Sequence, residues 1–426
     1  MLTQAWKQLR PHPVQRQLWV TPKRFVGVYA GRGSGKTDIS KRRLVRMLPV
    51  KKPWHDPRYF YGAPTQEQAK RIAWNDIIAL VPPQWVKARS DSNLTIVTHF
   101  GSTLQVVGLD KPQRIEGVQW DGAVLDESSD LKPGTFDLSI LPALTHRTGW
   151  CWRIGVPKRQ GVGAAEFKDF CMLGESGDDP DIVAFTWPSS DILPPEALEY
   201  ARRTMDIKDY REQFEACWET AGGGIFYAFD PEFNVRPCAY HPELPLVIGS
   251  DFNVDPMAWV VGHRYPNRME WIDEIWLRDT NTQKTLETLW QRYQHHQGGF
   301  EFYGDATGQA RRTSASASDY KIIYADERFS KTVHYPKANP PIKDRFSACN
   351  AMLCNAAGER RMFIDPKCKR LIKDLESRYY KPGTTDVADS GDLGHITDAM
   401  GYAVHRLFPM RVNIITRQQP VIVRSN

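Results

Sequence analysis

The chain has 426 residues, of which 41% are hydrophobic and 25% charged, and its 14 Trp and 16 Tyr exclude an intrinsically disordered protein. The formal net charge of +6 suits a polyanionic partner without requiring one. Seven cysteines without a C-x-x-C pair disfavour a disulfide framework or a zinc site, and no stretch approaches the roughly 20 apolar residues of a membrane span. We therefore expect a soluble, intracellular protein of two domains, because single cores rarely exceed about 300 residues.

The first motif along the chain is a glycine-rich segment, AGRGSGKT, at residues 30–37. The apolar run at 25–30 predicts a strand before it, and residues 38–48 predict a helix after it. In such a loop the backbone cradles phosphates, Lys36 reaches the β- and γ-phosphates, and Thr37 places its hydroxyl on Mg²⁺. The residues predicted to bind ATP here are Gly31, Gly33, Ser34, Gly35, Lys36 and Thr37.

Three further residues are candidates for the same site. Gln15 precedes the first strand and is a candidate for a hydrogen bond to the adenine edge. Transition-state charge also needs a cation. Arg32, inside the loop, is a candidate arginine finger acting in cis, and Arg114 is the alternative, acting on a neighbouring subunit. The sequence leaves this choice open.

Strands and helices alternate after the loop. Residues 57–64 predict a strand, 65–81 a helix, and 95–100 with 102–109 a hairpin around Gly101. This order is typical of a mostly parallel sheet with helices on both faces.

A second acidic motif follows at residues 117–130, GVQWDGAVLDESSD. Its apolar run ends at Asp126 and Glu127. Behind a phosphate loop, such a strand delivers an aspartate to the Mg²⁺ shell, and the next glutamate orients the attacking water. We therefore predict that Asp126 binds Mg-ATP and that Glu127 is catalytic.

The first half closes with another strand and a long helical pattern. Residues 150–161 predict a strand that leads into GVPK, the position where motor ATPases place a polar coupling residue, although Val156 is apolar. Residues 195–219 predict a helix. The glycines at 222–224 and the segment HPELP at 241–245 then indicate a hinge between two domains.

In the second half, three aspartates follow predicted elements. Asp251 and Asp305 end two apolar strands, and Asp398 lies near the start of a helix predicted over 389–408. Carboxylates that converge from strands in a β-β-β-α-β order are typical of an RNase H-like nuclease, which holds two divalent ions. Oxygen ligands favour Mg²⁺, with Mn²⁺ as the alternative.

Other residues have a less specific pattern. Asp392 and His395 are candidate auxiliary metal ligands beside Asp398. The candidate DNA-backbone contacts are Arg311, Arg312, Lys337, Lys343 and Arg345, for which a solvated surface position is the alternative.

Taken in order, GRGSGKT, VLDE (124–127), GSDFNVDP, YGDATG and HITDAMGY resemble the large terminase subunit of tailed bacteriophages, from about His12 to Arg406. The resemblance implies an α/β protein with an N-terminal P-loop (RecA/ASCE-like) ATPase domain and a C-terminal RNase H-like nuclease domain. The expected limits are 1–220 for the ATPase domain, with a lid at 185–220, 221–245 for the linker, 246–408 for the nuclease domain and 409–426 for a tail.

The resemblance also implies a function in viral genome packaging. ATP hydrolysis would move double-stranded DNA into a procapsid, and a two-metal endonuclease would cut concatemeric DNA. The implied partners are the portal protein, a small terminase subunit and further copies of the chain in a ring. The implied place is the host bacterial cytoplasm and, transiently, the portal, but not the finished virion. The alternatives are an ATP-dependent helicase-nuclease and an ATP-gated DNA-binding module with an inactive nuclease fold.

Overall fold

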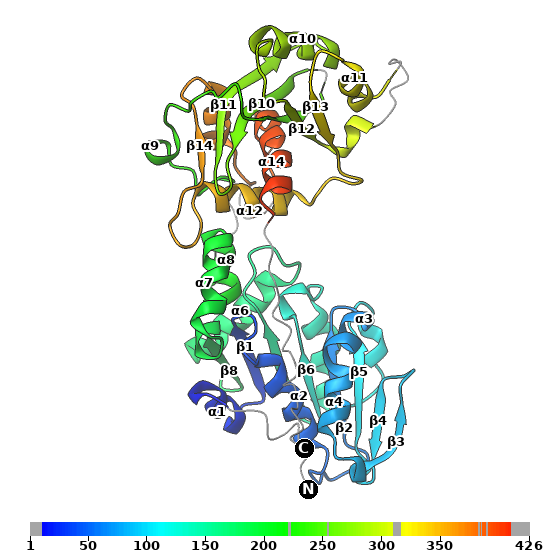
Figure 1. Ribbon diagram of the computed structural model, residues 1–426. Helices are drawn as coiled ribbons and strands as arrows, with labels where there is room; N and C mark the ends of the chain where they lie inside the picture. Colours follow the sequence, from blue (N-terminus) through cyan, green and yellow to red (C-terminus); the bar gives the residue numbers. More distant parts are fainter. Residues whose placement is uncertain are drawn as a thin grey trace, which may run out of the picture. The chain divides into compact units, whose positions relative to one another are not determined.

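The computed structural model describes residues 11–219, 223–253, 255–309, 317–381, 384, 386–388 and 391–409 (Figure 1). The chain divides into two compact units, residues 1–198 with 211–221 and residues 199–210 with 222–426. None of the helices in the described part is both long and apolar enough to cross a membrane.

The first unit is built on a sheet of eight strands among its described residues. The sheet order is β3-β4-β5-β2-β6-β7-β1-β8. All pairs from β5 to β8 are parallel, and β3 and β4 add an antiparallel edge. The strands are β1 (Phe25–Ala30), β2 (Arg58–Ala63), β3 (Val86–Ser90), β4 (Thr95–Thr98), β5 (Thr103–Gly108), β6 (Gly122–Leu125), β7 (Trp150–Gly155) and β8 (Ile182–Trp187).

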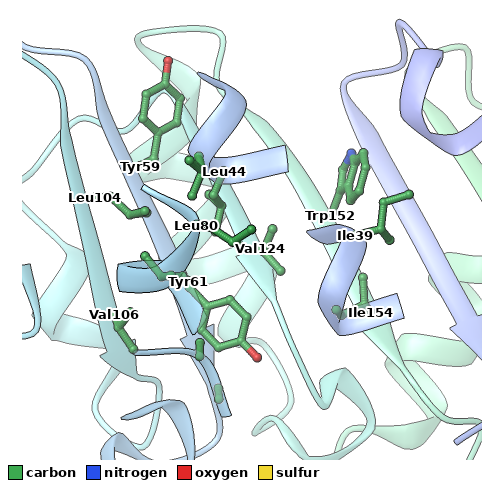
Figure 2. Packing of buried hydrophobic residues seen from close by; sticks show 14 of the residues in the cluster. Ile39, Leu44, Tyr59, Tyr61, Leu80, Leu104, Val106, Val124, Trp152 and Ile154 are labelled. Atoms are coloured by element: carbon green, nitrogen blue, oxygen red, sulfur yellow. The ribbon is translucent and has the colours of Figure 1, made fainter. Parts of the chain in front are cut away.

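Helices cover both faces of this sheet, as expected for strands that are buried on both sides. One face packs against α2 and α4, where Ile39, Leu44 and Leu80 meet aromatic and β-branched residues of β2, β6 and β7 (Figure 2). The other face packs against α6 through Phe167 and Phe170. The helices are α1 (Pro13–Val20), α2 (Lys36–Met47), α3 (Gln66–Ala69), α4 (Asn75–Leu80), α5 (Leu141–Thr145) and α6 (Ala164–Ser176).

The predicted strands and the hairpin at Gly101, with a φ angle of +86°, are confirmed. Two helix predictions need correction. The helix expected over 65–81 is interrupted by a π-helical turn at Lys70–Trp74. The helix expected over 195–219 is split into α7 (Pro195–Thr204) and α8 (Ile207–Phe214), because Asp206 caps the backbone N–H groups of Lys208 and Asp209.

The second unit has the mixed sheet of an RNase H-like fold. The order is β13-β12-β9-β10-β11-β14; β9 is antiparallel to β10 and parallel to β12. The strands are β9 (Leu246–Asp251), β10 (Met257–Arg264), β11 (Met269–Leu277), β12 (Phe300–Gly304), β13 (Lys331–His334) and β14 (Met362–Ile364). The helices are α9 (Pro231–Asn234), α10 (Thr282–Tyr293), α11 (Asp319–Ala325), α12 (Ile342–Leu353), α13 (Lys369–Ser377) and α14 (His395–Leu407).

Helix α14 lies directly on β9 and beside α12 (Figure 1). A Cβ atom at Gly249 would lie 2.4 Å from the carbonyl oxygen of Ala399, so glycine allows this close approach. The helix begins at His395 and not at residue 389, because Gly394 has a φ angle of +110° that no helical residue adopts. Its predicted apolar face is confirmed by the full burial of Ile396, Ala399, Met400 and Ala403.

The limits predicted for the two domains and for the linker remain a prediction. In the segment expected as a linker, Ile225 and Phe226 are buried in the core of the second unit together with Phe346 and Met352. This segment therefore contributes to the second core.

Substitution of Leu104 tests the packing of the first sheet. Leu104 on β5 is fully buried, so Leu104→Ala leaves a cavity and should lower the free energy of unfolding by about 2–5 kcal/mol. The midpoint of thermal unfolding measures this effect. Leu138→Ala is the control, because Leu138 is 78% exposed and its loss should cost less than about 0.5 kcal/mol. Equal shifts for both variants would contradict the packing described.

Candidate active sites

The glycine-rich loop runs from the end of β1 to the start of α2. Gly33 and Gly35 have φ angles of +72° and +78°, in the left-handed region where a side chain is strained. A Cβ atom at Gly31 would lie 2.3 Å from the Oγ atom of Ser189. The backbone path of the loop therefore depends on glycine at these positions.

Two buried polar atoms of this loop region have no hydrogen-bond partner among the described residues. Gln15 donates from Nε2 to the carbonyl of Ser34 at 3.2 Å, and Trp187 donates to the same carbonyl at 2.9 Å. The Oε1 atom of Gln15 and the Oγ atom of Ser34 stay unpaired. Buried polar atoms are normally satisfied, so this pair fits a polar ligand: an amino group on Gln15 and a phosphate oxygen on Ser34.

Thr37 and Asp126 lie in contact, although 89 residues separate them. Thr37 donates from Oγ1 to Oδ2 of Asp126 at 2.8 Å, and Tyr61 donates to the same oxygen at 2.5 Å. Burial and the neighbouring Glu127 raise the pKa of Asp126, while Tyr61, Lys36 and Thr37 act in the opposite direction. A threonine hydroxyl and a carboxylate side by side are the oxygen ligands that fit Mg²⁺.

Lys36 is buried, 7% exposed, and its Nζ atom donates to the carbonyl of Gly31 at 3.3 Å. Burial lowers its pKa, and the charges of Glu127 and Asp126 oppose this shift. Burial strengthens the attraction of this ammonium for an anion, so its position suits a phosphate.

Glu127 is bound by a lysine that the sequence analysis did not assign. Lys158 donates from Nζ to Oε2 of Glu127 at 3.3 Å and to Asp130 at 2.5 Å. Burial alone would raise the pKa of Glu127, but Lys158 and Lys36 lower it below its ordinary value. Lys158 ends the GVPK segment, whose Val156 contributes only its carbonyl, an acceptor from Ser129 at 2.8 Å. The position of GVPK after a strand was the only sequence signal for this contact.

The two candidate arginine fingers lie in different surroundings. Arg32 is exposed on the loop, and its charge lowers the pKa of both Lys36 and Glu127. Arg114 is ion-paired with Asp110 at 3.1 Å. The structure therefore brings Arg32, and not Arg114, to the acidic pair of this chain.

The second candidate site lies at the edge of the second sheet. Ser250 and Gly304 are register partners on the parallel strands β9 and β12, so Asp251 and Asp305 follow at the same edge. Burial raises the pKa of Asp251; a hydrogen bond from His395 lowers it, and the charges of Asp398 and Asp305 raise it further. The three predicted carboxylates therefore lie within electrostatic reach of one another.

Asp398 is held by two buried arginines. Arg378 donates to its two carboxylate oxygens at 3.0 and 3.3 Å, and Arg345 donates at 3.2 Å. Arg345 and Arg378 are 4% and 7% exposed. The assignment of Arg345 as a surface DNA contact is therefore corrected: its guanidinium is buried on Asp398 and over the ring of Tyr402.

The remaining candidate ligands and DNA contacts of the second unit lie in different surroundings. His395 contacts Asp251 through Nδ1 at 2.9 Å, and this hydrogen bond raises the pKa of His395. Asp392 instead pairs with the exposed Arg278, which corrects its assignment as an auxiliary ligand. Lys343 is exposed on α12. Arg311 and Arg312 lie outside the described residues.

The donor types at the second site fit a divalent cation, but their arrangement fits only in part. Asp251 and Asp305 supply carboxylate oxygens at one sheet edge, which Mg²⁺ prefers. Asp398 is occupied by Arg345 and Arg378. Across the described part of the chain, no group of three or more His, Cys, Asp or Glu side chains gathers closely enough to hold a metal ion.

Proteins of known identity resemble this chain across both of its units. No protein-family model matches the chain. The large terminase subunit of Thermus virus P23-45 is 25% identical over 93% of this chain and 87% of its own length. The solved large terminase of a thermophilic bacteriophage covers 93% of this chain and 99% of its own, with a TM-score of 0.57 and 14% identity. This chain is similar to the phage large terminases over nearly its whole length.

A second structure of the same thermophilic bacteriophage terminase, in complex with ATP-gamma-S, covers 95% of this chain and 99% of its own, with a TM-score of 0.52 and 15% identity. These likenesses extend over both units. The expected fold of a large terminase, a P-loop ATPase-type unit followed by an RNase H-like unit, is thereby confirmed.

The arginine pair predicts how the protein responds to loss of Asp398. Asp398→Asn leaves Arg345 and Arg378 buried without a counter-charge, which outweighs the relief of repulsion with Asp251. We expect the free energy of unfolding to fall by about 3 kcal/mol, measured by chemical denaturation. Asp392→Asn is the matched control, because its exposed pair with Arg278 contributes less than about 1 kcal/mol. An Asp398→Asn protein as stable as the parent would show that the arginines do not need this carboxylate.

Proposed function

We propose that this chain is the large subunit of a viral DNA-packaging terminase. In this function ATP hydrolysis moves double-stranded DNA into a procapsid, and a metal-dependent endonuclease cuts concatemeric DNA at the start and end of packaging. The observation that carries the proposal is the contact of Thr37 with Asp126, beside Glu127, which is ion-paired with Lys158. In the same chain, the second unit places Asp251 and Asp305 at one edge of its sheet.

The proposed domain limits follow the expectation from the sequence. The ATPase domain comprises residues 1–220, with a lid at 185–220; the linker comprises 221–245, the nuclease domain 246–408 and the tail 409–426.

In the ATPase domain, the loop backbone and Lys36 bind the phosphates, and Gln15 accepts a hydrogen bond from the adenine amino group. Thr37 and Asp126 hold Mg²⁺, which when bound neutralises phosphate charge. Glu127, kept ionised by Lys158, orients a water molecule toward the γ-phosphorus and accepts its proton while the bond to ADP breaks. Arg32 supplies positive charge to the transferred phosphoryl group. The ATP-gamma-S complex of the thermophilic bacteriophage terminase supports the choice of nucleotide.

In the nuclease domain, Asp251 and Asp305 bind divalent metal, with Asp398 as the third carboxylate. Mg²⁺ or Mn²⁺ held there would supply an activated water for in-line attack on a DNA phosphorus, with cleavage of one P–O bond of the phosphodiester and departure of its oxygen. His395, which contacts Asp251, fixes the orientation of that carboxylate. Arg345 and Arg378 hold Asp398 at the start of α14.

The partners proposed are double-stranded DNA, a portal protein, a small terminase subunit and further copies of the chain in a ring. The place proposed is the host cytoplasm and, during packaging, the portal vertex.

One observation favours a second candidate, an ATP-gated DNA-binding module with an inactive nuclease fold. Asp398 is bound by two arginines, and the described residues hold no three-ligand cluster. A helicase-nuclease has no such support, because the second unit has the RNase H strand order and not that of a second ATPase sheet.

Two variants of the intact protein test the two activities separately. Lys36→Ala removes the ammonium that faces the phosphates and should lower ATP turnover by at least about 100-fold, with DNA cleavage retained. Asp251→Asn should abolish nicking of plasmid DNA in Mg²⁺ and Mn²⁺ and leave ATP turnover intact. Asp392→Asn is the control for the second variant and should cut normally. Cleavage by the Asp251→Asn protein would refute the nuclease assignment, and absence of cleavage by the parent in both metals would select the inactive module.

The pH dependence of ATP turnover tests Lys158. Because Lys158 lowers the pKa of Glu127, Lys158→Ala should raise that pKa. Glu127 would then be protonated at a higher pH, and the acidic limb of the kcat profile should move to higher pH. Lys158→Arg should restore the profile, and Lys70→Ala, an exposed lysine of the same unit, should not change it. An unshifted limb in Lys158→Ala would exclude Glu127 as the group that this limb reports.

A further inference from the structure

A cavity of about 1110 Å³ lies in the second unit, beside the candidate nuclease carboxylates. Its walls come from the ends of β12 and β13, the segment after β13 and the last turns of α14. Gly304, which directly precedes Asp305, lines it, and so does Tyr402, one helical turn after Asp398. Ligand pockets of roughly 300–1,000 Å³ hold drug-sized molecules, so this cavity has room for more than one nucleotide.

Three cations line the cavity. Arg264, Lys337 and Arg406 are exposed, and none forms an ion pair with a carboxylate of the described residues. Several acids lie nearby. Glu301 accepts a hydrogen bond from the hydroxyl of Tyr303 at 3.0 Å, and its charge acts on His334. The charge of Asp344 acts on His405, and the charges of Asp398, Asp305 and Asp251 act on Tyr402. Each of the three exposed cations can contact a phosphate group, as Lys and Arg do along a nucleic-acid backbone.

Aromatic rings line the same cavity. Tyr303 and His334 are stacked, with ring centroids 4.6 Å apart and an interplanar angle of 12°. Burial lowers the pKa of His334, and Arg406 and Arg264 lower it further, while the charge of Glu301 acts in the opposite direction. Tyr335 is 56% exposed, and its ring centroid lies 5.0 Å from that of Tyr320. Flat rings beside cations are the combination that binds nucleobases by stacking and phosphates by charge.

The aromatic wall is linked to the carboxylate edge. The hydroxyl of Tyr320 donates to the carbonyl of Asp305 at 2.7 Å. A base stacked near Tyr335 therefore lies on a wall that continues to Asp305. In a duplex the faces of the bases are covered by their neighbours, so only an unpaired strand offers faces to these rings.

We propose that this cavity binds a short unpaired segment of DNA, whose bases stack on Tyr335 and on His334, which packs on the buried Tyr303, while Arg264, Lys337 and Arg406 hold its phosphates. That the ligand is DNA rests on the proposed function. That the bound DNA is single-stranded is inferred from the aromatic rings of the cavity. The bound segment leads along the wall toward the carboxylates of Asp251 and Asp305.

Binding to the full chain without metal or ATP tests the proposal. Fluorescence anisotropy of a short labelled oligothymidylate in EDTA measures the dissociation constant. Tyr335→Ala should raise it between about fivefold and a hundredfold through loss of stacking, and Tyr335→Phe should leave it unchanged. Because Tyr335 is largely exposed, neither variant removes core packing, and thermal unfolding checks this.

The salt dependence tests the phosphate contacts. Arg406→Ala and Lys337→Ala should each reduce the slope of log K against log salt by about 0.7, the value for one phosphate contact on a single strand. Lys284→Ala, an exposed lysine on α10 outside the cavity, is the control and should leave the slope unchanged.

Three outcomes would overturn the proposal. The first is that Tyr335→Ala binds the oligothymidylate as tightly as the parent protein, and the second is that Tyr335→Ala weakens binding of a blunt duplex by the same factor. The third is that thymidine monophosphate displaces the oligothymidylate at equal concentration. The last would indicate a mononucleotide site. These measurements need no cleavage, so an inactive nuclease would refute the proposed function and leave strand binding intact.

Discussion

The hydrogen bond from Thr37 to Asp126 joins the helix after the glycine-rich loop to the strand that carries the acidic pair. It exists only because β1, β7 and β6 pair in parallel, so that the loop and Asp126 emerge at the same edge of the sheet. The charges at that edge then balance: Lys36 and Lys158 face Asp126 and Glu127. A low-dielectric position strengthens each of these interactions and makes an unpaired charge costly.

In the second unit, parallel strands again place acidic side chains at one edge of the sheet, but different cations pair with them. Asp251 and Asp305 share an edge because β9 and β12 are parallel neighbours. The helix α14 adds Asp398 from a separate direction, and Arg345 and Arg378 neutralise it. The first site thus combines lysines with an acidic pair, whereas the second combines arginines with a carboxylate cluster. The proposed strand-binding cavity adjoins this cluster through Gly304 and Tyr402.

Local pattern was sufficient for much of the fold. Apolar runs such as residues 25–30 and 246–248 became buried strands, and the alternation on α14 separated its buried and half-buried faces. The predicted helix limits were wrong where a single polar or glycine residue sets the point at which a helix begins or ends. Asp206 caps a second helix, although the apolar spacing continues through that position, and Gly394 delays the start of α14.

The sequence by itself determined the loop, the strand-end carboxylates and the order of the two units, because these depend on neighbours along the chain. Only the tertiary structure decided which cations meet which acids. Lys158 reaches Glu127 across 31 residues, and Arg345 reaches Asp398 across 53. A charge at a distant position has no periodicity or local motif that marks its partner. Its place depends on which strands pair and which helices pack, and the folded chain as a whole fixes that.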